Sequence, residues 1–160
     1  MRISKKFTVA RPPDWWTKIS LPGIEVFKDS LIGKGGFGKV YLGRRCVDNQ
    51  QVAIKVCEKK NKTEQEIQVI RQEYELQKLI RHPNVLETYG YFENESYVVI
   101  ILEYCAGGDL TNFVKERSNQ GGCPSLQEIS QIMKGIFMGL GYIHEELKAI
   151  HRDMKPRKKD

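Results

Sequence analysis

Three glycines in the stretch IGKGGFGKV, residues 32–40, have the spacing of a phosphate-binding loop. Gly33, Gly35 and Gly38 form a GxGxxG pattern, which lets the backbone bend tightly and bring its N–H groups close to phosphate oxygens. A dinucleotide-binding loop of this kind requires a helix directly after the glycines, whereas here the alternating pattern of a strand continues. A Walker A loop is nearly matched, but Val40 stands where its magnesium-binding Ser or Thr belongs. The pattern therefore indicates a phosphate-binding loop that is neither a dinucleotide-binding loop nor a Walker A loop.

A lysine and a glutamate form a second candidate pair. Lys55 ends the strand-like run VAIK and, taken alone, could mark the edge of a sheet. Glu73 follows Ile70 by three residues and precedes Leu76 and Ile80 by three and seven, which places its carboxylate on the apolar face of a helix. A carboxylate in that position is costly unless it is paired. We therefore expect Glu73 to pair with Lys55.

These groups must be positioned by a sheet and a helix. Residues 24–57 alternate apolar and polar side chains, which predicts about three strands. A capping box, TEQE at 63–66, predicts the start of a helix, and HPN at 82–84 is expected to end it because the residue before a proline is pushed out of helical geometry. Two further strand-like runs, 86–92 and 96–103, complete a small lobe.

Helices dominate the rest of the sequence. A short helix is predicted over 109–117, and a second capping box, SLQE at 125–128, opens a long helix with apolar residues at 126, 129, 132, 133, 136, 137, 140 and 143. Strands first and helices afterwards are typical of an α+β fold in two lobes. The expected fold is therefore α+β, with an antiparallel sheet of about five strands and one helix, followed by the first helices of a helical lobe.

Composition and charge exclude several classes of protein. The 160 residues carry a net charge of +6, but half of the excess lies in residues 152–160, and elsewhere basic side chains are mixed with glutamates, which is typical of a solvated surface and not of a nucleic-acid interface. The four cysteines form no CxxC pair, so neither a zinc site nor a disulfide framework is indicated. The longest strongly apolar run, 98–102, is far shorter than the about 20 residues of a membrane span. We expect a cytoplasmic chain, with the nucleus as the alternative, that binds neither nucleic acid nor membrane.

The order of the motifs resembles the amino-terminal half of a eukaryotic protein kinase of the Ser/Thr type. GKGGFGKV and VAIK are followed by Glu73, by HPN nine residues later, by a hinge-like LEYCAGGDL and by HRDMKP at 151–156. The resemblance implies an amino-terminal arm over 1–23, a kinase small lobe over 24–104 and the incomplete start of the large lobe, ending in the catalytic loop, over 105–160. Within the family, RHPNVLETYGYF is similar to the Aurora kinases.

By this resemblance the chain binds ATP, and Mg²⁺ is the metal of the complete family site. The nucleotide contacts would be Ile32, Val40 and Ala53 against the adenine, Gly33, Lys34, Gly35, Gly36, Phe37 and Gly38 over the phosphates, the gatekeeper Leu102, the hinge residues Glu103 and Cys105, and Asp109 at the ribose. Lys55, oriented by Glu73, would hold the α- and β-phosphates. Asp153 would orient the attacking hydroxyl and accept its proton, and Lys155, as in Ser/Thr kinases, would steady the transferred phosphate.

The end of the sequence departs from the family pattern. Five residues after Asp153 the family has a metal-binding Asn, whereas this sequence has Lys158, which would repel a cation. No DFG follows, so both magnesium ligands are missing and no metal ligand is assigned. Two functions stay open. The first is a Ser/Thr kinase cut short, biologically or by a gene-model boundary, and inactive by itself; the second is a non-catalytic module that binds a nucleotide or a partner. The closing RKKD fits no motif and favours the first.

Two further features point to packing partners. In a complete kinase later helices would cover the long helix, so we expect the residues at 129, 132, 136, 140 and 143 to lack a cover and the chain to self-associate or to need a partner. In the arm, Trp15 and Trp16 are expected to pack on the domain, with a partner-docking motif as the alternative.

Overall fold

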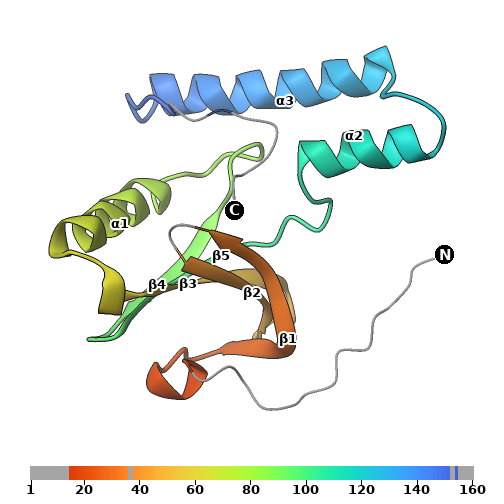
Figure 1. Ribbon diagram of the computed structural model, residues 1–160. Coiled ribbons are helices and arrows are strands. Elements are labelled where there is room, and N and C mark those ends of the chain that lie inside the picture. Colours follow the sequence, from red (N-terminus) through yellow and green to blue (C-terminus); the bar gives the residue numbers. More distant parts are fainter. Residues whose placement is uncertain (1–14, 36–37, 152–153, 155–160) are drawn as a thin grey trace. The chain divides into compact units, whose positions relative to one another are not determined.

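The computed structural model describes residues 15–35, 38–151 and 154, which form two compact units (Figure 1). The sheet unit comprises the described residues up to Leu79 together with Thr88–Tyr104. The helical unit comprises Ile80–Glu87 together with the described residues from Cys105 on.

The sheet unit holds, among its described residues, a five-stranded antiparallel sheet and one α-helix, which confirms the predicted α+β class. The strands are β1 (Ile24–Gly35), β2 (Gly38–Arg45), β3 (Gln51–Glu58), β4 (Thr88–Glu93) and β5 (Tyr97–Glu103), and their order in the sheet is β1-β2-β3-β5-β4. The helix is α1 (Glu64–Gln77), and the 3₁₀ helices η1 (Trp16–Lys18) and η2 (Lys59–Asn61) precede β1 and α1.

The central strands β3 and β5 are buried on both faces. Val52, Ile54 and Val56 of β3 point to one face, where they share a core cluster with Val99 and Ile101 of β5. Because side chains alternate along a strand, the residues between them point to the opposite face. Strands buried on both sides carry continuous apolar runs such as YVVIILE, which explains why β5 lacks a clear alternation in the sequence.

The segment before β1 completes the core cluster. Trp15, Ile19 and Leu21 are buried, and the ring of Trp15 lies 5.3 Å from that of Tyr41 on β2. The prediction that Trp15 packs on the domain is therefore confirmed. The Nδ2 group of Asn94, in the turn between β4 and β5, donates a 2.6 Å hydrogen bond to the carbonyl oxygen of Lys18, which fixes this segment across the sheet.

Helix α1 covers the second face of the sheet. It begins at the predicted capping box, in which the Thr63 hydroxyl accepts from the N–H of Glu66 and the Glu66 carboxylate accepts from the N–H of Thr63. Ile67 and Ile70 are its buried residues.

The prediction that this helix continues to HPN is wrong. It ends at Gln77, where the N–H of Lys78 bonds back to Tyr74 and that of Leu79 bonds to Leu76, so the last turn tightens before the proline is reached. Ile80 is buried but lies outside the helix, and Leu76 is exposed, because it falls about 120° around the helix from Ile70.

The helical unit contains α2 (Leu110–Asn119) and α3 (Leu126–Glu145). The second predicted capping box, Ser125 with Glu128, opens α3 as expected, and Glu128 also pairs with Arg117 of α2. The ring of His82 stacks on that of Tyr142 at 5.1 Å, which packs the HPN segment on α3. No described helix is both long enough and apolar enough to cross a membrane.

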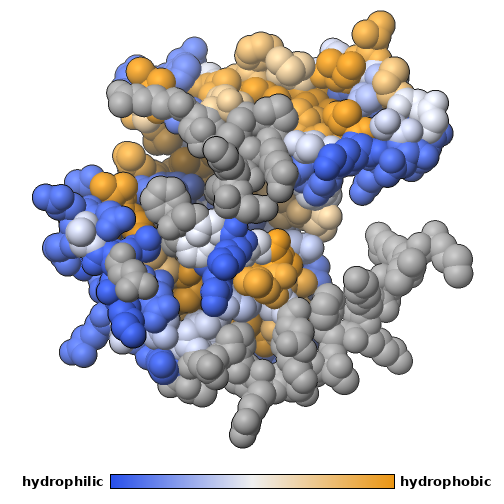
Figure 2. Space-filling view, viewed as in Figure 1, coloured by the Kyte–Doolittle hydropathy of each residue, from blue (hydrophilic) through white to orange (hydrophobic). Residues whose placement is uncertain are grey.

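The apolar side chains of α3 are exposed in a pattern that differs from the expectation. Of the five residues expected to lack a cover, Ile129 is exposed, whereas those at 132, 136, 140 and 143 are partly buried. The most exposed apolar side chains of this helix are instead Leu126, Phe137 and Met138. Figure 2 shows hydrophobic side chains gathered over α3.

Candidate functional site

The charge pair expected from the sequence is present in the sheet unit. Lys55 of β3 and Glu73 of α1 form an ion pair with a distance of 3.9 Å between Nζ and Oε1. The lysine side chain is 14% exposed and the glutamate side chain is 41% exposed. A nearly buried ammonium beside a carboxylate has the charge and the donors that recognise an anion such as a phosphate.

Strand register places four of the predicted nucleotide contacts on one face of the sheet. Val40 lies opposite Lys55, and Ala53 lies opposite Leu102, so the members of each pair share a face. Lys55 and Ala53 are two residues apart on β3, so both pairs share the same face. Because Lys55 reaches Glu73, this is the face on which α1 lies. The ammonium is therefore bordered by Val40, Ala53 and Leu102, an apolar surface suited to a flat ring.

The hairpin that carries the glycine motif requires a glycine at position 38. Gly38 has φ of +143°, and a Cβ there would lie 2.1 Å from the backbone oxygen of Val56 on β3. At Gly33 a Cβ would be only in ordinary contact with Val40 at 3.7 Å. The close approach of the start of β2 to the backbone of β3 thus requires a glycine at position 38, whereas Gly33 is sterically free to carry a side chain.

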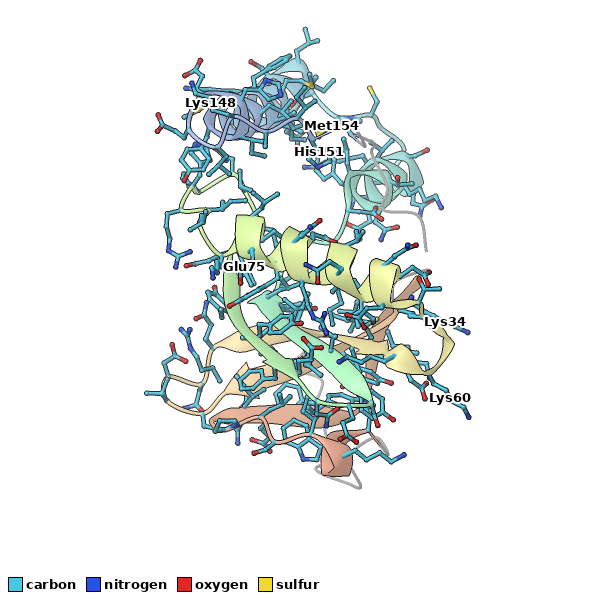
Figure 3. All side chains as sticks on the ribbon, turned by 90° about the vertical axis from the view of Figure 1, so that its left-hand side faces the viewer. Lys34, Lys60, Glu75, Lys148, His151 and Met154 are labelled. Atoms are coloured by element: carbon cyan, nitrogen blue, oxygen red, sulfur yellow. The ribbon has the colours of Figure 1, made fainter. Side chains whose placement is uncertain are left out.

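Two residues of the glycine stretch point away from the face that carries Lys55. Lys34 lies opposite Lys39, one step along the ladder from the pair of Gly33 and Val40, so both lysine side chains occupy the other face. Figure 3 shows Lys34 extending from the edge of the sheet unit, and its side chain is exposed. Ile32 lies at a register irregularity of β1 and is exposed.

The remaining predicted site residues are distributed over other parts of the chain. Glu103 ends β5 in the sheet unit, and Cys105 is exposed in the helical unit. Asp109 caps α2, since its Oδ1 accepts a 2.8 Å hydrogen bond from the N–H of Asn112. Gly35 ends β1. Gly36, Phe37, Asp153, Lys155 and Lys158 lie outside the described residues, so their predicted roles stay predictions.

No pattern in the sequence predicts a second group of charges, which lies beside the Lys55–Glu73 pair. Glu93, the last residue of β4, accepts hydrogen bonds from Lys59, Arg71 and Tyr91. The contact between Arg71 and Glu93 spans 22 residues, and no periodicity or motif marks either residue. Only the general rule that a half-buried carboxylate needs a cationic partner could have predicted the contact between Arg71 and Glu93.

Comparison with known proteins places this geometry in a family. The sequence of residues 27–158 matches the family described as the protein kinase domain. The chain is 35% identical over 127 residues to the serine/threonine-protein kinase TIO of Arabidopsis thaliana. The matched stretch covers 79% of this chain and 9% of that protein. The chain is 36% identical over 125 residues to the serine/threonine-protein kinase PLK4 of Nematostella vectensis, and this match covers 78% of this chain and 12% of that protein. An Aurora kinase of Encephalitozoon cuniculi is 33% identical over 144 residues, covering 89% and 50%.

The fold is shared with a solved structure. The crystal structure of Rad53 1-466 in complex with AMP-PNP superposes with a TM-score of 0.68 at 24% identity, over 84% of this chain and 33% of that one. The chain spans between 9% and 50% of the length of the curated relatives named above. With its five-stranded sheet, its paired Lys55 and Glu73 and a family match over most of its length, this chain belongs to the protein kinase domain family.

Proposed function

We propose that the sheet unit binds the adenine and phosphates of ATP for a serine/threonine protein kinase. The observation that carries this proposal is the ion pair of Lys55 and Glu73 on the same face as Val40, Ala53 and Leu102. The ammonium supplies charge for the α- and β-phosphates, and the apolar residues supply a surface for the base. The hairpin at Gly38 brings backbone N–H groups to the phosphates.

In the complete protein we propose transfer of the γ-phosphate to Ser or Thr hydroxyls of proteins in the cytoplasm. The substrate oxygen forms the new bond to the γ-phosphorus while the bond from that phosphorus to the β-γ bridging oxygen breaks. The hydroxyl proton passes to the carboxylate of Asp153, and Lys155 steadies the transferred group. Support comes from the HRDMKP motif and from the relatives, which are named serine/threonine kinases.

The residues of this chain do not fit the magnesium ions of the family. Lys158 stands where the family has a metal-binding Asn, and the described residues contain no cluster of three His, Cys, Asp or Glu side chains that could hold a metal. A lysine offers an ammonium group, which repels a cation. We therefore assign no step of phosphate transfer to a metal held by these 160 residues.

Lys158 favours a second candidate function for this stretch of chain. Without a metal ligand at that position, the 160 residues would act as a non-catalytic module that binds nucleotide or a partner. Phosphoryl transfer depends on positioning and charge neutralisation, and both are reduced when the metal sites are incomplete.

Phosphate incorporation tests whether these 160 residues transfer phosphate by themselves. The polypeptide of the printed sequence is incubated with ATP labelled at the γ-phosphate, Mg²⁺ and a generic Ser/Thr substrate protein, and Asp153→Ala is the matched control. We expect no incorporation above that of the control. Incorporation that Asp153→Ala abolishes would show that the 160 residues are catalytic and would exclude the non-catalytic module.

A further inference from the structure

Glu93 joins the two elements that carry the Lys55–Glu73 pair. Its carboxylate accepts hydrogen bonds from Arg71 of α1, 3.1 Å from Nε and 2.6 Å from Nη2. The same carboxylate accepts from Nζ of Lys59, the residue directly after β3, and from the hydroxyl of Tyr91 on its own strand. One side chain of β4 therefore connects α1 with the end of β3.

The environment of Glu93 makes these contacts stronger than those of a surface ion pair. Its side chain is 19% exposed and that of Lys59 is 18% exposed, so water competes little for either charge. Hydrogen bonds from Arg71 first, and then from Lys59 and Tyr91, lower the pKa of Glu93 to about 2. The carboxylate is therefore ionised throughout the neutral range.

A stacked pair of aromatic rings supports the same side of the helix. Tyr74 of α1 lies against Tyr91 of β4 with 4.5 Å between ring centroids and an interplanar angle of 29°. Tyr74 is one turn of helix after Ile70, so the stack and the buried isoleucines face the sheet together. The contact with Arg71 is therefore part of a packed seam between α1 and β4.

Arg71 and Glu73 lie at opposite edges of the sheet-facing stripe of α1. With about 100° per residue, Arg71 lies roughly 100° to one side of Ile70 and Glu73 roughly 60° to the other, with Ile67 between Arg71 and Ile70. A rotation of the helix that carried Glu73 away from Lys55 would have to move Arg71 relative to Glu93. Both of those contacts fix the same rotational setting.

We propose that Glu93 is a positioning residue for Lys55: through Arg71 it holds α1 at the rotation at which Glu73 meets the ammonium, and through Lys59 it ties that rotation to the strand that carries the lysine. This inference deepens the proposed function, since Lys55 is the proposed phosphate-binding group. The pair itself has a separation of 3.9 Å, at the long end for an ion pair, so its closure is sensitive to small rotations of α1.

The state of Lys55 can be measured without a nucleotide. Lysine side chains are labelled with ¹³C and ¹⁵N, and the Lys55 resonances are assigned by their loss in Lys55→Met. Glu73→Gln gives the position of the resonances when the pair is broken. We expect Glu93→Gln to move the Lys55 resonances at least half of the way toward the position that they have in Glu73→Gln. Lys55 resonances that stay at the wild-type position in Glu93→Gln would overturn the proposal.

Matched variants separate positioning from general damage. Glu64→Gln removes the other acidic partner of Arg71, an exposed residue on the same helix, and should leave Lys55 at its wild-type position. Arg71→Lys keeps the charge but cannot form the two-nitrogen contact with Glu93, and it should move Lys55 in the direction of Glu73→Gln. If Glu93→Gln does not fold, Arg71→Lys gives the same two outcomes.

Nucleotide affinity supplies the second readout. We expect Glu93→Gln to weaken ATP binding by about two- to thirtyfold in the wild-type background and to cause no further loss in a Lys55→Met background. An equal loss in both backgrounds would mean a merely structural role and would overturn the proposal. If the wild-type chain binds no ATP, the proposed function fails, and the Lys55 resonances still decide whether Glu93 positions the pair.

Discussion

Single residues decide whether the site can form, and Gly38 is the clearest case. Its positive φ and the backbone oxygen of Val56 behind it leave no room for a Cβ, whereas Gly33 in the same motif has ordinary space. A GxGxxG pattern read from sequence treats these glycines alike. Their different surroundings, the Val40 side chain of β2 beside Gly33 and the Val56 backbone of β3 beside Gly38, make them unequal.

We predict that Gly38→Ala lowers the free energy of unfolding of the sheet unit by about 1–3 kcal/mol, because the hairpin must shift or adopt a strained backbone. Gly33→Ala, the matched control, should change it by less than about 0.5 kcal/mol. Denaturant unfolding measures both. Equal effects of the two substitutions would contradict the geometry described for Gly38.

The contacts of the single residue Glu93 lead us to predict that the stability of the protein depends on pH. The hydrogen bonds from the groups that face this carboxylate, Arg71, Lys59 and Tyr91, lower its pKa from 4.5 to about 2 in the folded protein. A carboxyl group whose pKa is lowered contributes stability above its unfolded pKa and loses it as the pH falls. The stability difference between wild type and Glu93→Gln should therefore be constant at neutral pH and shrink between pH 4.5 and about 2. A difference that stays unchanged over this range would show that Glu93 is not held by these cations.

At the scale of elements, local signals in the sequence predict where helices begin. The two capping boxes, Thr63 with Glu66 and Ser125 with Glu128, each involve residues three apart, and both are present as predicted. The pairing of Lys55 with Glu73 could be predicted because burial of a carboxylate requires a partner.

Contacts between distant segments could not be predicted in this way. The end of α1 at Gln77 depends on a tightened last turn and not on Pro83, and the exposure of Leu76 follows from which side of the helix meets the sheet. The contact of Arg71 with Glu93 depends on how β4 is placed beside α1. The sequence alone allows several helix ends and several buried faces, and the packing of the helix on the sheet decides among them.

The contact between α3 and the segment before β4 gives a prediction for the helical unit. A Cβ on Gly139 would lie 2.9 Å from the backbone oxygen of Asn84, whereas a Cβ on Gly135 would meet the movable side-chain amide of the same residue at 3.2 Å. Gly139→Ala should therefore destabilise this contact by about 1–3 kcal/mol, and Gly135→Ala should cost less. Amide hydrogen exchange of α3 measures both variants, and faster exchange in Gly135→Ala than in Gly139→Ala would contradict the account.

At the scale of the whole molecule, self-association through α3 remains a prediction. Leu126, Phe137 and Met138 are exposed on this helix, and clustered apolar surface favours association. We expect the 160-residue polypeptide to sediment as a concentration-dependent oligomer and Phe137→Glu to shift it toward the monomer. Gln131→Glu, at an exposed polar position of α3, is the charge-matched control and should have no effect. A monomer at all concentrations would refute this prediction.

Nucleotide binding by the sheet unit is the central claim, and a titration of the 160-residue polypeptide with ATP tests it most directly. We expect saturable binding that changes little with Mg²⁺, because Lys158 replaces a metal ligand, and that Lys55→Met weakens by about tenfold or more, since it removes a charge-assisted contact to phosphate. Lys60→Met, at an exposed lysine of the same unit, should bind like wild type (Figure 3). Binding that Lys55→Met leaves unchanged, or no binding by the wild-type chain, would contradict the account.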